Sequence, residues 1–362
     1  MDRPGKHPPP KGRGALSNRP SRFAATEAVA VDDGWGSLEE APRAVLTELR
    51  ADTARHAITY NRSPDIPFDR SINSYQGCEH GCVYCYARPS HSYWSLGAGL
   101  DFETRIIHKP NLLQLLEREL RAPGYVCQPI NLGANTDPYQ PVERELRSTR
   151  AVLETLLAHR HPVTLLTKGT LILRDLDLLT ELAARRLASV LVSLTTLDDE
   201  LKRRMEPRAA APAARLRVIE TLARAGVPVG VLHAPVIPAI NDHELERLVE
   251  AAAGAGASHV GHVLLRLPNE LETLFREWLA THYPERASRV MKLLCEMRGG
   301  RANDPRFGDR MRGTGPYADL IERRVSAAAR RHGLEYTRAR GPRLDTSQFL
   351  AEPDAPRQAS LF

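Results

Sequence analysis

The sequence contains few cysteines and no long apolar run, and each shortage excludes a class of protein. Only five of the 362 residues are cysteine and three of these are clustered, which argues against the disulfide framework of a small secreted protein. No stretch approaches the ~18 consecutive apolar residues of a membrane span. The first residues are basic and lack the apolar segment of a secretory signal. We therefore expect a cytoplasmic protein that does not bind membranes.

The three clustered cysteines, Cys78, Cys82 and Cys85, lie in GCEHGCVYCYARPSHSYW with the spacing C-x3-C-x2-C. In a reducing compartment such a cluster more often binds a metal than forms disulfides. Thiolates select zinc, copper(I) or iron–sulfur clusters. Structural zinc takes four ligands, and His80 or His91 could supply the fourth. A four-iron cluster usually takes four thiolates, so three would leave one iron free to bind another molecule.

Short apolar runs alternate with helical patterns through the middle of the chain. The predicted strands are residues 70–77, 129–134, 162–168, 188–195, 227–237 and 258–267. Helices are expected to begin near Asn111, Val142, Leu173, Ala213, Asp242 and Asn269. Six strand–helix units in series predict a parallel sheet, and their number suits an incomplete barrel. An open doubly wound sheet would give a similar pattern.

Polar residues stand where several of these strands end. In a βα barrel, functional side chains gather at the carboxyl ends of the strands. The residues at these positions are Cys78, Asn135, Thr136, Asp137, Lys168, Ser193 and Thr195. We therefore expect the cysteine loop and these side chains to lie at one end of the barrel.

The chain divides into four predicted segments. Residues 1–55 are rich in proline, glycine and arginine, then acidic, and are expected to form a weakly ordered N-terminal extension. The barrel core is predicted at residues 56–285. Residues 286–340 are expected to form a basic helical extension, and residues 341–362 a flexible tail.

The net charge of +6 is unevenly distributed. Between Gly299 and Asp345 there are eleven arginines against six aspartates and glutamates. Arginine recognises phosphate through its planar fork of donors, so this segment predicts a nucleic-acid-binding surface. The alternative is a solvated helix face without a partner.

The cysteine spacing, with Tyr84 just before the third cysteine, resembles the signature of the radical S-adenosylmethionine (SAM) enzymes. This resemblance implies a partial (β/α)6 TIM barrel with the cysteine loop after its first strand. It also implies a [4Fe-4S] cluster whose free iron binds SAM. The reduced cluster would cleave SAM to a 5′-deoxyadenosyl radical, with the electron supplied by a reductant such as flavodoxin or ferredoxin.

Longer segments narrow the resemblance to the spore photoproduct lyase-like branch, and within it to a bacterial group whose reaction is unsettled. It covers about residues 55 to 335. The segments are NRSPDIPFDRSINSYQGCEHGCVYCYARPSH, LDFETRIIHKPN, GANTDPYQPVE, LLTKGTLILRDLDLL, VSLTTLD, MEPRAAAPAARL and VLHAPVIPAIND. They imply a repair-like reaction on nucleic acid. The alternatives are a radical enzyme for a peptide or small molecule, and a non-catalytic zinc or iron–sulfur module.

The resemblance also implies ligands for the cluster and for the SAM carboxylate. Cys78, Cys82 and Cys85 match the three cluster ligands. Lys168 matches a strand-end lysine that pairs with the carboxylate of SAM. Ser193 matches a serine that touches the same group.

Five further residues match positions around the rest of the SAM molecule. Tyr84 is expected to lie against the adenine. Thr136 and Ala234 match positions near the nucleoside and the methionine. Asn135 and Asp137 stand where the superfamily usually offers polar contacts to the amino group.

One feature of the lyase is missing. The lyase places a cysteine, which gives a hydrogen atom to the product radical, just after its second strand, but residues 133–137 here read GANTD. Cys127 precedes that strand and Cys295 follows the sixth helix, where each is more often a small buried hydrophobic residue. The hydrogen-atom donor is thus unidentified. A second cluster, as methylthiolation needs, would require about three more thiolates, and only Cys127 and Cys295 remain.

The sequence ends in Gln358-Ala359-Ser360-Leu361-Phe362. This resembles the pentapeptide by which bacterial repair proteins dock on the replication sliding clamp, with Ala359 in place of leucine. A short extended peptide with two apolar anchors can bind such a pocket. We therefore expect the sliding clamp as a partner.

Overall fold

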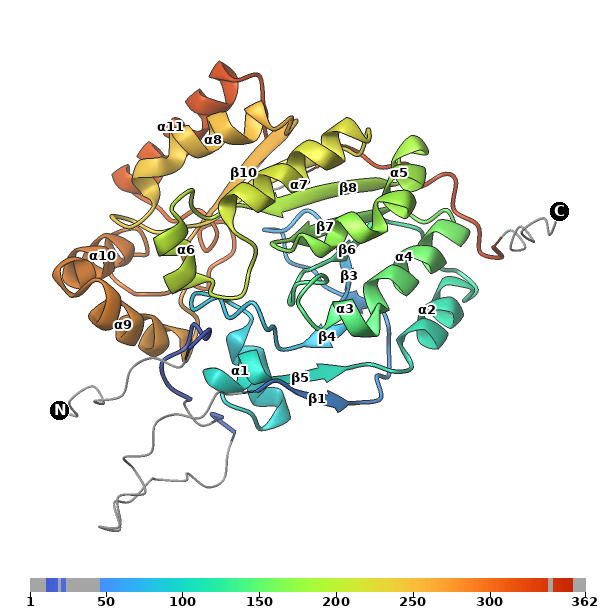
Figure 1. The fold of residues 1–362 in the computed structure, drawn as a ribbon, viewed down its shortest axis with the longest axis horizontal. Coiled ribbons are helices and arrows are strands. Elements are labelled where there is room, and N and C mark those ends of the chain that lie inside the picture. The colour runs from blue at the N-terminus through green and yellow to red at the C-terminus, as the bar shows by residue number, and fades with distance from the viewer. Residues whose placement is uncertain (1–10, 19–20, 24–45, 338–340, 354–362) are drawn as a thin grey trace, which may run out of the picture.

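The structure is a computed structural model that describes residues 11–18, 21–23, 46–337 and 341–353 (Figure 1). The predicted docking peptide, Gln358–Phe362, lies outside the described residues. Within the described part, no helix is both long enough and apolar enough to cross a membrane.

The six predicted strands form and lie side by side in chain order. Each pairs in parallel with the next, from β3 through β6, β7, β8 and β9 to β10. Antiparallel β2 lies beside β3, and parallel β11 lies beside β10. The strands are β2 (Thr59–Tyr60), β3 (Arg70–Ile72), β6 (Ile130–Leu132), β7 (Val163–Thr167), β8 (Ala188–Ser193), β9 (Val229–Val236), β10 (His259–Leu264) and β11 (Glu335–Tyr336). The partial (β/α)6 barrel is confirmed.

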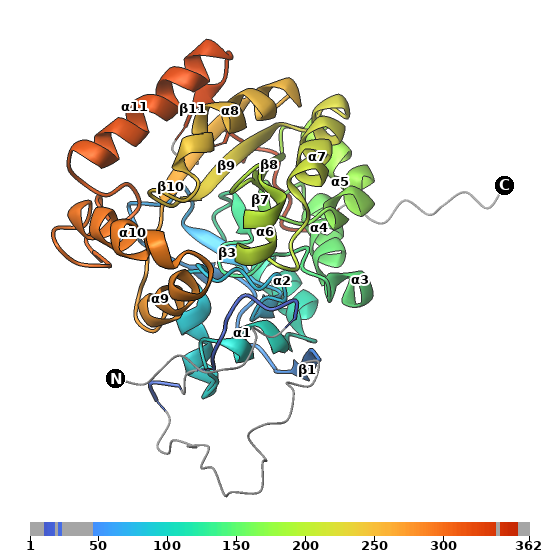
Figure 2. The same ribbon diagram turned by 60° about the vertical axis from the view of Figure 1, so that its left-hand side comes forward.

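Helices follow the strands in turn and cover the outside of the sheet (Figures 1 and 2). They are α2 (Leu112–Leu120), α3 (Glu143–Leu146), α4 (Ser148–Ala158), α5 (Leu176–Ala184), α7 (Pro212–Arg224), α8 (Leu245–Gly254) and α9 (Leu271–His282). The predicted helix starts are confirmed to within a few residues. Gly226, at φ +75°, ends the α7 segment as its position before the β9 run predicts.

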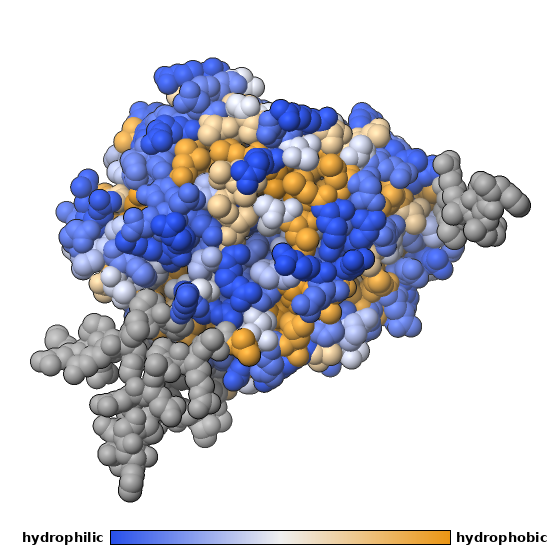
Figure 3. All heavy atoms as spheres, viewed as in Figure 1, coloured by the Kyte–Doolittle hydropathy of each residue, from blue (hydrophilic) through white to orange (hydrophobic). Residues whose placement is uncertain are grey.

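The apolar spacing of these helices explains why they pack against the sheet. In α2, the buried residues Leu112, Leu115, Leu116 and Leu120 recur at intervals of three and four and form one face. Together with the buried strands they build a continuous hydrophobic core. Hydrophilic side chains cover the outer helices α10 (Pro284–Glu296) and α11 (Pro316–Arg331) in the space-filling view (Figure 3).

Several short elements are absent from the sequence prediction. The predicted strand 70–77 is split: β3 stays in the barrel, whereas β4 (Tyr75–Gln76) turns away to pair antiparallel with β5 (Arg105–His108). β1 (Glu48–Ala51) completes this second sheet by pairing in parallel with β5. The remaining elements are η1 (Arg88–Trp94), α1 (Leu100–Thr104), η2 (Leu171–Asp175), α6 (Asp199–Met205) and η3 (Asp242–Glu244).

Part of the N-terminal extension packs against the body of the protein, which the sequence did not predict. Arg13 and Ala15 are buried, although we expected residues 1–55 to be weakly ordered. The backbone N–H groups of Gly14 and Ala15 donate to the carboxylate of Glu103, at 2.9 and 2.8 Å. A short piece of the extension is thus fixed to the body of the protein by a buried acidic side chain.

The C-terminal segment 341–353 also departs from the expected tail. It crosses the amino ends of the barrel strands, at the right of Figure 1. Leu344 is buried, and the ring of Phe349 packs against those of Tyr125, His159 and His161. This segment therefore closes the amino end of the barrel.

Candidate active site

A cavity of about 2700 Å³ opens inside the curved sheet. It is lined by all ten residues that the sequence analysis assigned to cluster or SAM binding: Cys78, Cys82, Tyr84, Cys85, Asn135, Thr136, Asp137, Lys168, Ser193 and Ala234. They come from the loop after β3 and from the carboxyl ends of β6, β7, β8 and β9. The barrel thus brings the predicted site together.

The cysteine loop is held by backbone contacts on both sides. The Cys78 N–H donates to the Phe102 carbonyl at 2.8 Å, and the Val83 N–H donates to the Met205 carbonyl at 3.0 Å. Gly14 lies so close that a Cβ there would fall 1.8 Å from the Gly81 carbonyl oxygen. Any side chain at position 14 would push the N-terminal segment off the loop.

A buried ion pair between Arg88 and Glu103 also holds the cysteine loop in place. Arg88 and Glu103 are both fully buried and paired. The Arg88 guanidinium also donates to the Cys82 carbonyl at 2.9 Å and to the Gly99 carbonyl at 2.8 Å. Because a buried charge is stable only with its partners in place, this pair fixes the loop geometry.

The three thiols fit the ligand set of a metal cluster. All three are free cysteines, and burial raises the pKa of each one. The nearby Asp137 carboxylate raises the pKa of Cys78 further. Three buried neighbouring thiols become thiolates readily only beside a strong positive charge, which a bound metal centre provides.

The histidines that could complete a zinc site have other partners. His91 Nε2 lies 3.0 Å from the Arg105 carbonyl oxygen, and its ring packs edge-on against Phe102. His80 Nδ1 lies 3.2 Å from an Asp137 oxygen. In each histidine one ring nitrogen is engaged, so a zinc site with three cysteines and one histidine would have to use the other nitrogen, His91 Nδ1 or His80 Nε2. Among the described residues, no three His, Cys, Asp or Glu side chains are grouped around a single metal position.

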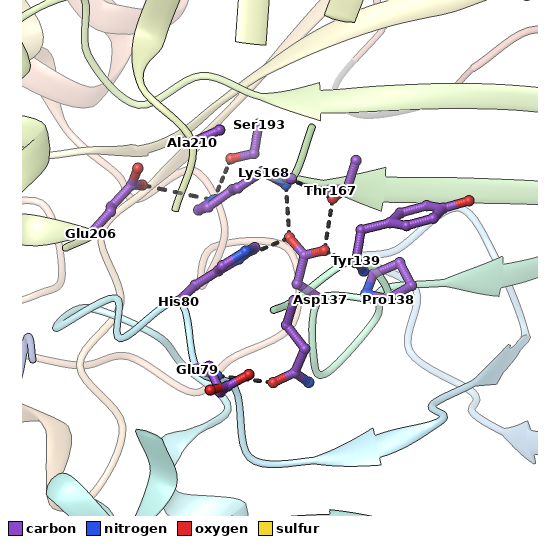
Figure 4. Close-up of polar contacts among 12 residues, drawn as sticks. Glu79, His80, Asp137, Pro138, Tyr139, Thr167, Lys168, Ser193, Glu206 and Ala210 are labelled. Atoms are coloured by element: carbon purple, nitrogen blue, oxygen red, sulfur yellow. Dashed lines mark hydrogen bonds and ion pairs between the residues drawn. The ribbon is translucent and has the colours of Figure 1, made fainter. Parts of the chain in front are cut away.

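Asp137 is the centre of a hydrogen-bond network at the carboxyl end of β7 (Figure 4). One carboxylate oxygen accepts from Thr167 Oγ1 at 2.7 Å and from the Tyr139 N–H at 2.9 Å. The other accepts from the Lys168 N–H at 2.7 Å and faces His80. Burial alone would raise the pKa of Asp137, but His80 and these hydrogen bonds outweigh it and lower the pKa to about 2.

Lys168 and Ser193, which the resemblance assigns to the SAM carboxylate, contact each other across neighbouring strands (Figure 4). Lys168 Nζ donates to Ser193 Oγ at 2.5 Å and lies 3.9 Å from a carboxylate oxygen of Glu206. It also lies 5.8 Å from the centre of the Tyr84 ring. Burial lowers the pKa of Lys168, and the neighbouring Cys82 raises it. An ammonium group placed this way can receive a carboxylate.

A family model described as "Radical SAM superfamily" matches residues 72–252, half of the chain. The chain belongs to the radical SAM superfamily. Its cofactors are therefore a [4Fe-4S] cluster and SAM, and it is an enzyme that cleaves SAM.

Two uncharacterized proteins are similar to this chain in sequence. An uncharacterized protein of Mycobacterium tuberculosis is 40% identical over 230 residues, which cover 63% of this chain and 68% of the relative. An uncharacterized protein of Methanocaldococcus jannaschii is 27% identical over 217 residues, covering 59% of this chain and 76% of that protein.

Solved structures of spore photoproduct lyase share the fold. One variant superimposes with a TM-score of 0.59 at 15% identity and covers 80% of this chain and 81% of the lyase. Another, described with bound AdoMet and dinucleoside spore photoproduct, gives a TM-score of 0.57 at 15% identity over the same shares. At this identity the likeness shows the fold alone.

In this radical SAM enzyme, the remaining predicted SAM residues mostly hold the loop after β6. The Asn135 N–H donates to Asn73 Oδ1 at 3.0 Å, and Thr136 Oγ1 donates to the Tyr75 carbonyl at 3.0 Å. Asp137 already receives four contacts, about the number that a carboxylate accepts. This favours a positioning role for Asp137 over direct contact with the SAM amino group. The direct contact stays a prediction.

Glu206, which is not among the predicted site residues, is fully buried beside them. Its carboxylate receives hydrogen bonds from Tyr84 Oη, from Thr195 Oγ1 at 2.6 Å and from the guanidinium of Arg215. Thr195 Oγ1 also lies 3.2 Å from the carbonyl oxygen of Ala234. Glu206 thereby orients residues on both sides of the cavity. Both members of the Glu206–Arg215 pair lie in the segment MEPRAAAPAARL, but nothing in that segment marks either residue as buried.

A second missed residue is Tyr86, which follows the third cysteine and lines the cavity. Its hydroxyl donates to the carbonyl of Ala134, in the stretch where the lyase has its cysteine. Cys127 precedes β6 at the opposite end of that strand, and Cys295 lies in α10. The structure thus leaves the cysteine position of the lyase without a thiol, as the sequence predicts.

Proposed function

We propose that this radical SAM enzyme acts on nucleic acid in a repair-like reaction. The observation that carries this proposal is the arginine lining of the cavity that contains the three thiols. These arginines come from the loop after β2, the segment after β10 and the helix α11: Arg62, Arg266, Arg310, Arg312 and Arg323. A cationic wall beside a radical site is suited to a polyanionic substrate.

Among these arginines, the surroundings of Arg266 give the strongest support for phosphate binding. It is half-buried, its Nη1 lies 3.5 Å from Met311 Sδ, and its Nε has no hydrogen-bond acceptor among the described residues. Burial, and then the neighbouring Arg310, lower the pKa of its guanidinium. A guanidinium that is partly desolvated beside a second one would gain from a phosphate, which can satisfy both forks.

In this proposal Cys78, Cys82 and Cys85 hold the cluster. Lys168 and Ser193 bind the carboxylate of SAM. The loop after β6, fixed by Asp137, positions the amino group and the nucleoside, and Glu206 keeps Tyr84 and Lys168 in place. When bound, the reduced cluster and SAM supply the 5′-deoxyadenosyl radical that abstracts hydrogen from the substrate.

Hydrogen bonds close the lateral opening of the partial barrel next to these arginines. The Gly308 N–H donates to Asp65 at 2.6 Å, and Arg310 donates to Asp65 and to Ser63 Oγ. These contacts join the loop after β2, one edge strand of the sheet, to the segment after β10, which lies next to the other edge strand, β11. The basic C-terminal extension is thus tied to the mouth of the cavity, where a substrate would enter.

Salt-dependent DNA binding by the reconstituted protein tests the proposal. The logarithm of the affinity should fall steeply with the logarithm of salt concentration, and Arg312→Ala with Arg323→Ala should reduce that slope by about 2. Arg224→Ala, an exposed arginine of α7, is the matched control and should leave the slope unchanged. Absence of binding at low salt, or an equal effect of the control, would favour a peptide or small-molecule substrate instead.

A further inference from the structure

Exposed aromatic side chains line the cavity next to the cysteine loop. Tyr93 and Trp94 lie at the end of η1 and are 74% and 37% exposed, and Tyr86 is 50% exposed. All three line the cavity. Large aromatic side chains gain much free energy from burial, so a group of three left open at a functional cavity indicates a contact surface for a partner.

Two arginines already lie over these rings. The Arg22 guanidinium lies 5.9 Å from the centre of the Tyr93 ring and 5.0 Å from that of Phe23. The Arg266 guanidinium lies 5.9 Å from the centre of the Tyr86 ring. The surface therefore alternates flat aromatic faces with flat cationic groups, the two kinds of surface on which nucleobases stack.

The element that carries Tyr93 and Trp94, η1, is held in place by buried contacts. His91 and Ser92 are buried, and the Ser92 carbonyl accepts a hydrogen bond from Ser21 Oγ at 3.1 Å. His91 is fixed through the Arg105 carbonyl, and Arg88 through Glu103. Tyr93 and Trp94 thus project from a turn that is already ordered, which reduces the entropy cost of binding.

We propose that Tyr86, Tyr93 and Trp94 form a stacking surface for unpaired bases, so that the enzyme prefers single-stranded nucleic acid to duplex. In a duplex the faces of the bases are covered by their neighbours, and only an unpaired or extruded base can stack on a protein ring. This proposal rests on the proposed action on nucleic acid and specifies its substrate class.

The test measures binding of a fluorescein-labelled DNA strand of about 12 nucleotides, free and annealed to its complement. The free strand should bind more tightly. Tyr93→Ala should weaken its binding about tenfold and leave duplex binding unchanged, because a stacking contact is lost. Tyr93→Phe should retain the affinity, since it keeps the ring.

Tyr60→Ala is the matched control. Tyr60 is 59% exposed and carries the Arg70 guanidinium 5.3 Å from its ring centre, but it lies in β2 at the sheet edge. Its replacement should not change binding of either DNA. Because Tyr93 is so exposed, its replacement should leave the melting temperature unchanged, which a thermal scan checks.

Failure of this inference can be told from failure of the proposed function. Duplex and single strand binding equally well, with no effect of Tyr93→Ala, would overturn the stacking surface and leave action on nucleic acid standing. Binding of neither DNA would overturn both. If Tyr93→Ala keeps full DNA affinity but slows turnover with flavodoxin and not with dithionite, the surface docks the reductant and the inference is wrong.

Discussion

The two ends of the barrel are built from different chemistry. At the carboxyl end of the strands, charged groups are buried in pairs: Glu206 with Arg215, and Arg88 with Glu103. At the amino end, Phe349 packs against the rings of Tyr125 and the neighbouring histidines. There His161 is held by neutral partners, Tyr125 Oη at 2.8 Å and the Pro162 carbonyl at 2.9 Å.

This difference shows which end has requirements beyond stability. Buried ion pairs contribute little net stability over an apolar core, because desolvation opposes their attraction. They do fix the orientation of the side chains they contact, here Tyr84, Lys168 and the cysteine loop. The amino end only has to be closed, and aromatic packing does most of this; the buried Arg70 there pairs with Asp69 at the surface and lies 5.7 Å from the centre of the Tyr125 ring. Substitutions at the two ends should therefore fail in different ways.

Loss of a cluster ligand should have the largest effect. Cys78→Ala, Cys82→Ala or Cys85→Ala should abolish both iron binding and formation of 5′-deoxyadenosine, because one corner of the cluster loses its thiolate. Iron and sulfide analysis after anaerobic reconstitution measures the first, and chromatography of the products the second.

Cys127→Ala and Cys295→Ala are the matched controls for these variants. Both residues are free cysteines outside the cysteine loop. Each control variant should bind iron as the native protein does. Equal iron loss in a control and in Cys78→Ala would contradict the ligand assignment.

Breaking the charged network should destabilise the carboxyl end strongly. Glu206→Ala leaves the buried Arg215 guanidinium without its carboxylate, which should cost about 3–5 kcal/mol in the free energy of unfolding. Glu200→Ala removes the carboxylate of the exposed Glu200–Arg204 pair and should cost less than about 1 kcal/mol. Urea unfolding of the two variants measures the difference. Similar costs would mean that Glu206 is not the buried hub described here.

Lys168→Ala should preserve the cluster and weaken SAM binding. The lost charge-assisted hydrogen bond corresponds to about 1.5–3 kcal/mol, or roughly tenfold to a hundredfold in the dissociation constant. Titration calorimetry with the iron-loaded variant measures this. An unchanged dissociation constant would rule out the pairing of Lys168 with the SAM carboxylate.

The smallest effect is expected at the amino end and depends on pH. Burial, and to a smaller extent the Arg70 charge, lower the pKa of His161 from its ordinary value of 6.5 to about 3. The unfolded chain therefore binds the proton first as the pH falls, and stability is lost progressively below about pH 6.5. Between pH 7 and 5 this group should cost about 2 kcal/mol.

His161→Gln removes that titrating group. Urea unfolding at pH 7 and pH 5 should show a smaller loss of stability for the variant than for the native protein. The same loss in both proteins would show that His161 is not held neutral at the closed end.

The barrel could be predicted from the sequence because its strands and helices carry strong local signals. Buried parallel strands appear as continuous apolar runs, and the helices between them show amphipathic spacing. The second sheet carries no such signal. All four residues of β1 are exposed and β4 has two residues, so backbone pairing with β5 defines them. Phe349 is a single aromatic residue in a polar segment, and only its neighbours in space reveal its packing.

The parts of the site that could be predicted are those whose residues form a recognisable pattern within a short stretch of sequence. Three closely spaced cysteines indicate a set of metal ligands. Lys168 and Ser193 lie at the ends of predicted strands, where functional side chains of a βα barrel gather. Glu206 and Arg215 could not be found in this way. The sequence does not distinguish a buried glutamate from an exposed one. The hydrogen-bond partners of Glu206 also come from three separate segments of the chain.

Anaerobic turnover with SAM and dithionite, with and without damaged DNA, tests the central claim most directly. The iron-loaded protein should form 5′-deoxyadenosine slowly by itself and faster when the DNA is present, while the Cys82→Ala protein forms none. A protein that carries iron yet forms no 5′-deoxyadenosine under either condition would contradict the account.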